Sequence, residues 1–160
     1  MQPIAGRAER IESGQPFAVV VDYAHTPDSL RALFETFENH RIIAVFGATG
    51  GGRDVWKRKE MGAVADKFCS VAILTDDDSY DEDPASIAKE IAKGFTRITP
   101  SIQTDRRKAI AEALAQAREG DAVLIAGKGT DPYLMGPRGK KEPWSDASVV
   151  KEELARLGYN

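Results

Sequence analysis

The 160-residue chain has little cysteine and histidine and no long apolar stretch: it contains one Cys, two His and no run of about 18 apolar residues. One cysteine, Cys69, cannot form an internal disulfide, which fits a reducing compartment. The first residues lack the apolar core of a signal peptide. We therefore expect a cytoplasmic protein without a membrane span.

Excess positive charge is also missing, because the net charge is −3. This gives no electrostatic basis for binding nucleic acid or an anionic membrane. No helix shows an extra apolar stripe that would demand a partner, so a monomer is expected. Metal sites are not indicated either: the two histidines are far apart in sequence, and the acidic stretch lacks the glycine and glutamate spacing of an EF-hand.

Apolar runs are present and alternate with amphipathic segments along the chain. Continuous runs at residues 17–21, 42–46, 71–75 and 122–126 are typical of strands buried on both faces of a parallel sheet. A weak strand is expected near 97–102, and a short edge strand at 133–135 before a turn over 136–143. The alternation predicts an α/β fold, a doubly wound, mostly parallel Rossmann-like sheet with helices on both faces.

Helix starts are marked by capping residues. Thr26 followed by Pro27, and Asp83 followed by Pro84, read as an N-cap and a first helical residue. Asp105 is expected to cap the next helix, and Ser145 or Asp146 the last one. Residues 1–16 are predicted to be a lead-in or interdomain linker, and residues 17–160 one domain.

Four loops follow the predicted strands, at residues 22–27, 47–54, 76–83 and 127–131. Because parallel strands end at one edge of a sheet, these loops should converge there and form a ligand site. The glycine-rich loop 47–54 allows backbone N–H groups to approach an anion, and Arg53 could clamp a carboxylate or phosphate. A nicotinamide site is disfavoured because Arg53 stands where a third glycine is needed.

The two remaining loops allow several interpretations. Loop 76–83 contains six carboxylates, which suit a solvated turn, a cation site or a pocket for an amine. Lys128, between two glycines, could meet a phosphate or a carboxylate, although a lysine in such a turn is more often simply exposed.

Together these motifs resemble the C-terminal domain of the Mur ligases, and within them the MurE type, which adds the third peptide residue to UDP-MurNAc-L-Ala-D-Glu. The resemblance covers nearly the whole chain in order. Its motifs are Gly6-Arg7, Asp22-Tyr-Ala-His-Thr-Pro-Asp28, Val45-Phe-Gly47, Gly52-Arg53-Asp54, Lys57-Arg58, Met61-Gly62, Thr75-Asp-Asp77, Gly127-Lys-Gly129 and Ser145-Asp146.

The resemblance implies an ATP- and Mg²⁺-dependent ligase that forms an acyl phosphate and passes it to an amine. It implies ATP contacts from Arg7, Asp22, Tyr23 and His25. It implies amino-acid contacts from Arg53, Asp77, Asp78, Tyr80, Gly127 and Asp131, and possible phosphate contacts from Lys57 and Lys128. The resemblance assigns Mg²⁺ mainly to a central domain.

The third loop departs from the family at one informative place. Diaminopimelate-using ligases carry Asp-Asn-Pro-Arg where this chain has Asp77-Asp78-Ser79-Tyr80. Without that arginine, a pocket containing Asp77, Asp78 and Asp131 should repel a second carboxylate and favour an ammonium group. The sequence therefore predicts a lysine-like diamine as substrate, in preference to diaminopimelate.

The 160 residues contain no Walker A sequence, and no segment matching the family's central ATPase or N-terminal UDP-binding domain. We expect the chain to work with those domains and to have no ligase activity alone. Two alternatives remain open at this stage: a folylpolyglutamate-synthetase-like ligase domain, and a non-catalytic module that binds a nucleotide or a partner.

Overall fold

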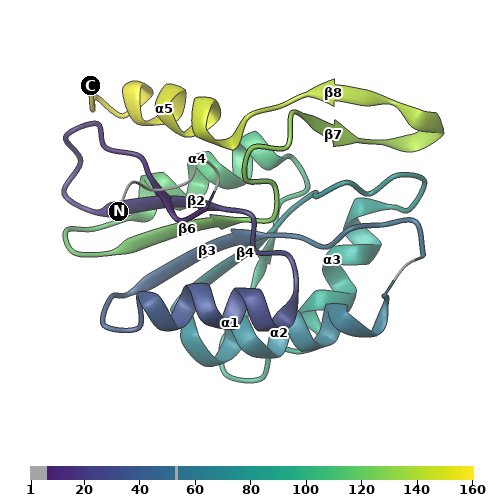
Figure 1. Cartoon of the computed structure of the whole chain (residues 1–160). Coiled ribbons are helices and arrows are strands. Elements are labelled where there is room, and N and C mark those ends of the chain that lie inside the picture. Colours follow the sequence, from purple (N-terminus) through teal and green to yellow (C-terminus); the bar gives the residue numbers. More distant parts are fainter. Residues whose placement is uncertain (1–6, 53) are drawn as a thin grey trace.

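The computed structural model describes residues 7–52 and 54–160, and its centre is a six-stranded sheet (Figure 1). The strand order is β1-β2-β6-β3-β4-β5. All pairings are parallel except that of β1 with β2. The predicted α/β class, with a mostly parallel sheet, is confirmed.

The strands lie close to the predicted apolar runs. Their bounds are β1 Glu9–Arg10, β2 Ala18–Asp22, β3 Ile42–Phe46, β4 Val71–Leu74, β5 Ser101–Ile102, β6 Ala122–Ala126, β7 Tyr133–Met135 and β8 Lys141–Pro143. The helices are α1 Pro27–Thr36, α2 Trp56–Phe68, α3 Pro84–Ala92, α4 Arg106–Gln116 and α5 Asp146–Arg156, with a short 3₁₀ turn at Pro137–Gly139.

Two apolar clusters, one on each face of the sheet, form the core. Alternate strand residues such as Val20 and Ala44 face α1, α2 and α3, whereas their neighbours such as Val19 and Val45 face α4 and α5. Figure 1 shows these helices as two layers on opposite sides of the sheet. This arrangement explains why β3, β4 and β6 are apolar at every position: side chains on both faces are buried.

The capping predictions are confirmed with one refinement. Thr26 accepts a hydrogen bond from the Ser29 N–H, and Ser29 Oγ accepts one from the Thr26 N–H, so α1 begins with a reciprocal capping box. Asp83 and Asp105 cap α3 and α4. Of the two candidates for α5, Ser145 is the cap.

The C-terminal third differs from the expectation of an edge strand followed by a turn. β7 does not join the main sheet; it pairs antiparallel with β8, so residues 133–143 form a separate hairpin. The signal was weak because Gly136, Pro137 and Gly139 interrupt any strand pattern. Within the expected lead-in, β1 pairs with β2, which attaches residues 9–10 to the sheet.

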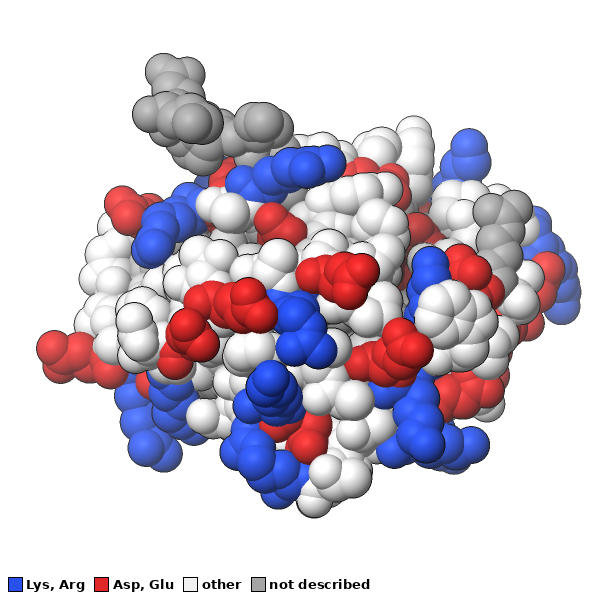
Figure 2. Space-filling model, turned by 60° about the horizontal axis from the view of Figure 1, so that its bottom comes forward, with Lys and Arg blue, Asp and Glu red and all other residues white. Residues whose placement is uncertain are grey.

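The outer surface over α1 and α2 carries charges of both signs. Figure 2 shows Lys and Arg interspersed with Asp and Glu on this face, with no large patch of one sign. Within residues 7–52 and 54–160, no helix is long and apolar enough to cross a membrane.

Candidate functional site

The four loops that follow the parallel strands lie together, as predicted, and hydrogen bonds join them to one another. The Gly127 N–H donates to the Asp22 carbonyl over 3.0 Å, and the Gly50 N–H donates to the Asp78 carbonyl over 2.8 Å. Lys128 Nζ donates to Asp78 Oδ1. The loops after β2, β6, β4 and β3 therefore form one continuous rim at the carboxyl edge of the sheet.

Two positions of this rim require glycine, because two backbone segments approach each other closely there. A Cβ atom on Gly47 would lie 2.1 Å from the Thr75 carbonyl oxygen, and one on Gly50 would lie 2.0 Å from the Ser79 carbonyl oxygen. These distances exclude any side chain without movement of the backbone. The glycines hold the loop after β3 directly against the loop after β4.

The four residues expected to contact ATP lie together around one hollow of about 210 Å³. Its lining includes Arg7, Asp22, Tyr23 and His25. Both carboxylate oxygens of Asp22 accept backbone N–H groups, from Ala8 at 2.6 Å and Ala24 at 2.7 Å. Asp22 therefore fixes the loop, while the rings of Tyr23 and His25 pack edge to face at 4.7 Å.

A second hollow, of about 230 Å³, continues from His25 toward the glycine-rich loop. Its lining includes Thr26, Lys57 and Arg58 from the starts of α1 and α2, and Thr49 from the glycine-rich loop. Lys57 Nζ lies 3.4 Å from Asp54, which also lines this hollow, and 5.5 Å from the Trp56 ring centre. Helix starts and a lysine at one hollow suit an anionic group.

Lys128 does not behave as expected. Its side chain is fully buried, and Nζ donates to Asp78 Oδ1 at 2.8 Å and Asp131 Oδ2 at 3.1 Å, with Asp77 Oδ1 at 4.0 Å. The expectation of an exposed lysine is wrong. The phosphate contact stays a prediction, which the carboxylates around the ammonium do not favour. Ion pairing is what makes a buried lysine tolerable.

The same contacts correct the charge argument for a diamine substrate. Asp77, Asp78 and Asp131 do not line an empty ammonium pocket, since all three face Lys128. Asp77 is itself buried, and burial raises its pKa to about 6 despite the nearby charges of Arg106 and Lys128. The carboxylates of this cluster therefore balance the charge of Lys128 within the protein.

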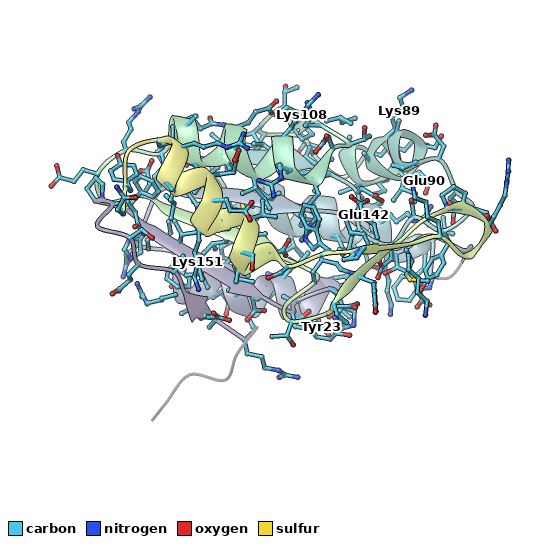
Figure 3. The ribbon with its side chains drawn as sticks, turned by 90° about the horizontal axis from the view of Figure 1, so that it is seen from above. Tyr23, Lys89, Glu90, Lys108, Glu142 and Lys151 are labelled. Carbon is cyan, nitrogen blue, oxygen red and sulfur yellow. The ribbon has the colours of Figure 1, made fainter. Side chains whose placement is uncertain are left out.

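A larger hollow of about 420 Å³ lies between the acidic loop and the β7–β8 hairpin. Its charged lining consists of Asp76, Asp81, Glu82, Asp83, Lys140 and Glu142, and Tyr80 also contributes. Tyr80 is 37% exposed and its N–H donates to the Met135 carbonyl, which ties the loop to the hairpin. In the view from above (Figure 3), Tyr23, Glu90 and Glu142 lie on the half of the molecule that carries the hairpin, and Lys151 lies on the other half.

Beneath the rim lies a buried ion pair that the sequence did not suggest. Arg106 donates to both carboxylate oxygens of Asp146, at 2.9 and 2.8 Å, and both side chains are fully buried. Arg106 also donates to the carbonyls of Asp76 and Ala126, at the carboxyl ends of β4 and β6. Spacing alone gives no signal for this pair, because its residues are 40 positions apart.

Arg58 is a further candidate functional residue, to which the sequence alone assigns no role. It is 2% exposed and makes a bidentate contact with Glu82, at 3.0 and 2.9 Å. Arg53, the expected carboxylate clamp, lies outside the described residues. The described residues contain no group of three or more His, Cys, Asp or Glu side chains placed to hold a metal ion.

Comparison with known families identifies the family of this chain. The model of the Mur ligase, glutamate ligase domain, matches residues 6–129. The chain belongs to the Mur ligase family. The matched segment ends within the loop after β6, so it contains Asp22, His25, Gly127 and the whole acidic loop.

Curated relatives are similar in sequence to this chain over nearly its full length. A UDP-N-acetylmuramoyl-L-alanyl-D-glutamate–2,6-diaminopimelate ligase of Chromobacterium violaceum is 41% identical over 99% of the chain. A UDP-N-acetylmuramyl-tripeptide synthetase of Roseiflexus is 42% identical over 98%. The chain spans 33% and 32% of these two relatives, and corresponds to the C-terminal part of the Mur ligases.

Solved structures agree on the fold. A UDP-N-acetylmuramoyl-L-alanyl-D-glutamate–2,6-diaminopimelate ligase superposes with a TM-score of 0.87 and 33% identity, over 100% of this chain and 33% of that one. A folylpolyglutamate synthase/dihydrofolate synthase from Yersinia pestis, crystallised with AMPPNP and Mn, superposes with a TM-score of 0.59 over 98% of this chain and 32% of that one. At 17% identity this second likeness concerns the fold alone.

Proposed function

We propose that this Mur ligase domain presents the incoming amino acid and contacts ATP in a ligase that adds the third residue to UDP-MurNAc-L-Ala-D-Glu. The observation that carries the proposal is the continuous rim of four loops, which carries the described residues that we assign to ATP and those that we assign to the amino acid. Two reactants held on one rim can be brought to a common reaction centre.

On the nucleotide side, the proposal assigns Arg7, Tyr23 and His25 to ATP, with Lys57 as a phosphate contact. Support comes from the shared hollow around Tyr23 and the adjoining hollow that reaches Lys57. In the proposed reaction the substrate carboxylate accepts the γ-phosphoryl group of ATP, and ADP leaves. Cations aimed at the phosphates stabilise the charge of that transition state, and Mg²⁺ held by a central domain would supply more.

On the amino-acid side, Arg53 is assigned to the α-carboxylate, and Tyr80 and Gly127 to the walls of the pocket. The amine then attacks the acyl phosphate, forming the amide bond and releasing phosphate. Asp77, Asp78 and Asp131 shape this pocket through Lys128 and do not bind the substrate ammonium directly. The chain by itself is expected to bind and orient substrates without ligating them.

We further propose that the added residue has a side-chain ammonium and no second carboxylate, as lysine does. Support now comes from the hollow beside Tyr80, whose described lining contains five carboxylates and a single cation, Lys140. The relatives from Chromobacterium violaceum and Aquifex aeolicus are named as diaminopimelate ligases, which makes diaminopimelate the competing substrate.

The test is a ligation assay on the full-length protein that contains this chain, with UDP-MurNAc-L-Ala-D-Glu, ATP, Mg²⁺ and a panel of amino acids. Turnover with lysine or ornithine supports both parts of the proposal. Turnover with diaminopimelate alone supports the ligase role and contradicts the specificity. No turnover with any amino acid contradicts the ligase role.

A further inference from the structure

Arg58 connects three separate segments at the back of the rim. Its guanidinium donates to Glu82 in the acidic loop and to Glu90 Oε2 in α3 at 2.6 Å. It also donates to the Thr49 carbonyl, in the glycine-rich loop, at 3.2 Å. One side chain of α2 thereby joins the loop after β3 to the loop after β4.

Glu82 completes this connection from the other side. While Oε1 accepts from Arg58, the same oxygen accepts the Gly52 N–H at 2.6 Å. Gly51 and Gly52 have φ angles of +84° and +77°, a left-handed conformation with no side chain to hold it in place. The acidic loop therefore restrains the glycine-rich loop immediately before position 53.

Arg58 borders the hollow that contains Lys57, but its guanidinium is engaged by protein groups and little of it is open to a ligand. It is 2% exposed and its charge is matched by two carboxylates, whose hydrogen bonds raise its pKa further. Glu82 and Glu90 are partly exposed, at 31% and 38% for their side chains. A bidentate arginine pair fixes orientation as well as distance, which a lysine cannot do.

We propose that Arg58, acting through Glu82, is a positioning residue that sets the affinity of this domain for its amino acid by fixing the glycine-rich loop. The inference rests on the proposed function, because the loop matters for affinity only if it presents Arg53 to the substrate carboxylate. Loosening the loop should weaken binding of that carboxylate in the ground state and the transition state alike. Such a uniform loss raises KM and leaves kcat nearly unchanged.

The experiment compares R58Q, R58K, E82Q and E90Q in the full-length protein. R58Q and E82Q are expected to raise KM for the amino acid about tenfold or more, with kcat and KM for ATP within about threefold of wild type. R58K should recover part of the loss, because lysine keeps one charged contact with Glu82. E90Q is expected to behave like wild type, since Glu90 does not touch the glycine-rich loop.

A matched arginine controls for general stability. Arg97 donates to the carbonyls of Asp66 and Cys69, which lie before β4 at the opposite edge of the sheet. R97Q should lower thermal stability without changing KM for the amino acid. Should R58Q fail to fold, the comparison of E82Q with E90Q still decides the question.

Hydrogen exchange gives a second readout that needs no turnover. The amides of Gly50 and Gly52 donate to Asp78 and Glu82, and should exchange faster in E82Q than in E90Q. Unchanged exchange, or an equal loss of all kinetic parameters in E82Q and E90Q, overturns the positioning role. A wild-type protein that ligates no amino acid instead overturns the proposed function.

Discussion

Lys128 Nζ lies 2.8 Å from Asp78 Oδ1, and this contact joins the loop after β6 to the loop after β4. The same Asp78 oxygen accepts the Met135 N–H at 2.8 Å, which adds the β7–β8 hairpin to the connection. A buried ammonium costs several kcal/mol unless it is paired. Asp78 and Asp131 provide that pairing, so the cluster holds the rim together and does not act as a vacant ammonium pocket.

Replacing Lys128 with methionine should therefore be strongly destabilising. The change leaves buried carboxylates without their counter-charge, and we expect the free energy of unfolding to fall by about 3–5 kcal/mol. Urea denaturation of K128M measures it. K57M is the matched control, since Lys57 is 30% exposed and pairs with an exposed Asp54, a type of contact worth about 1 kcal/mol or less. Equal losses in the two variants would contradict this account of Lys128.

The pKa of Asp77 predicts a pH effect on stability. Burial raises this pKa from 3.8 to about 6, although Arg106 and Lys128 oppose the rise while Asp78 and Asp146 add to it. The native state thus keeps a proton that the unfolded state has lost. Its contribution to stability is fully present below about pH 4 and is lost as the pH rises through about 6.

D77N removes the titratable carboxyl group and keeps nearly the same side-chain shape. The free energy of unfolding of wild type minus that of D77N should decrease between pH 4 and 6, by about 3 kcal/mol at most. Urea denaturation at four pH values between 4 and 7 measures the difference. A difference that is constant or increases over this range is the contrary result.

Gly50 should not tolerate even a methyl group. A Cβ there would lie 2.0 Å from the Ser79 carbonyl oxygen, so G50A must separate the loops after β3 and β4. We expect a loss of about 1–3 kcal/mol in the free energy of unfolding. G136A is the control, because its φ is −117° and its nearest neighbour, Lys140 Cβ, is 3.7 Å away. Comparable melting temperatures for the two variants would show that the loops are not in contact.

The sequence predicts most of the fold because the strands and helices obey local rules. Continuous apolar runs reveal β3 and β6 to within a residue, and Thr26 with Pro27 marks the start of α1. The β7–β8 hairpin is missed because its turn contains Pro and Gly, and because tertiary contacts such as the Tyr80 N–H to the Met135 carbonyl help to hold it in place.

The sequence predicts which loops form the site, but not which charged side chains pair within it. The carboxyl ends of parallel strands must converge, so the gathering of the four loops follows from topology. The pairing of Lys128 with Asp78, of Arg106 with Asp146 and of Arg58 with Glu82 depends on contacts across 50, 40 and 24 positions. No local spacing encodes these pairs, which is why Lys128 was expected to be exposed.

The most direct test of the account is the division of the rim into a nucleotide part and an amino-acid part. Steady-state ligation by the full-length protein should be measured for Y23A and R53A, varying ATP and the amino acid in turn. Tyr23 is 43% exposed, so its removal leaves the core intact. The account predicts that Y23A raises KM for ATP alone and R53A raises KM for the amino acid alone, each about tenfold or more. If both variants change the same KM, or neither variant changes any, the proposed division is wrong.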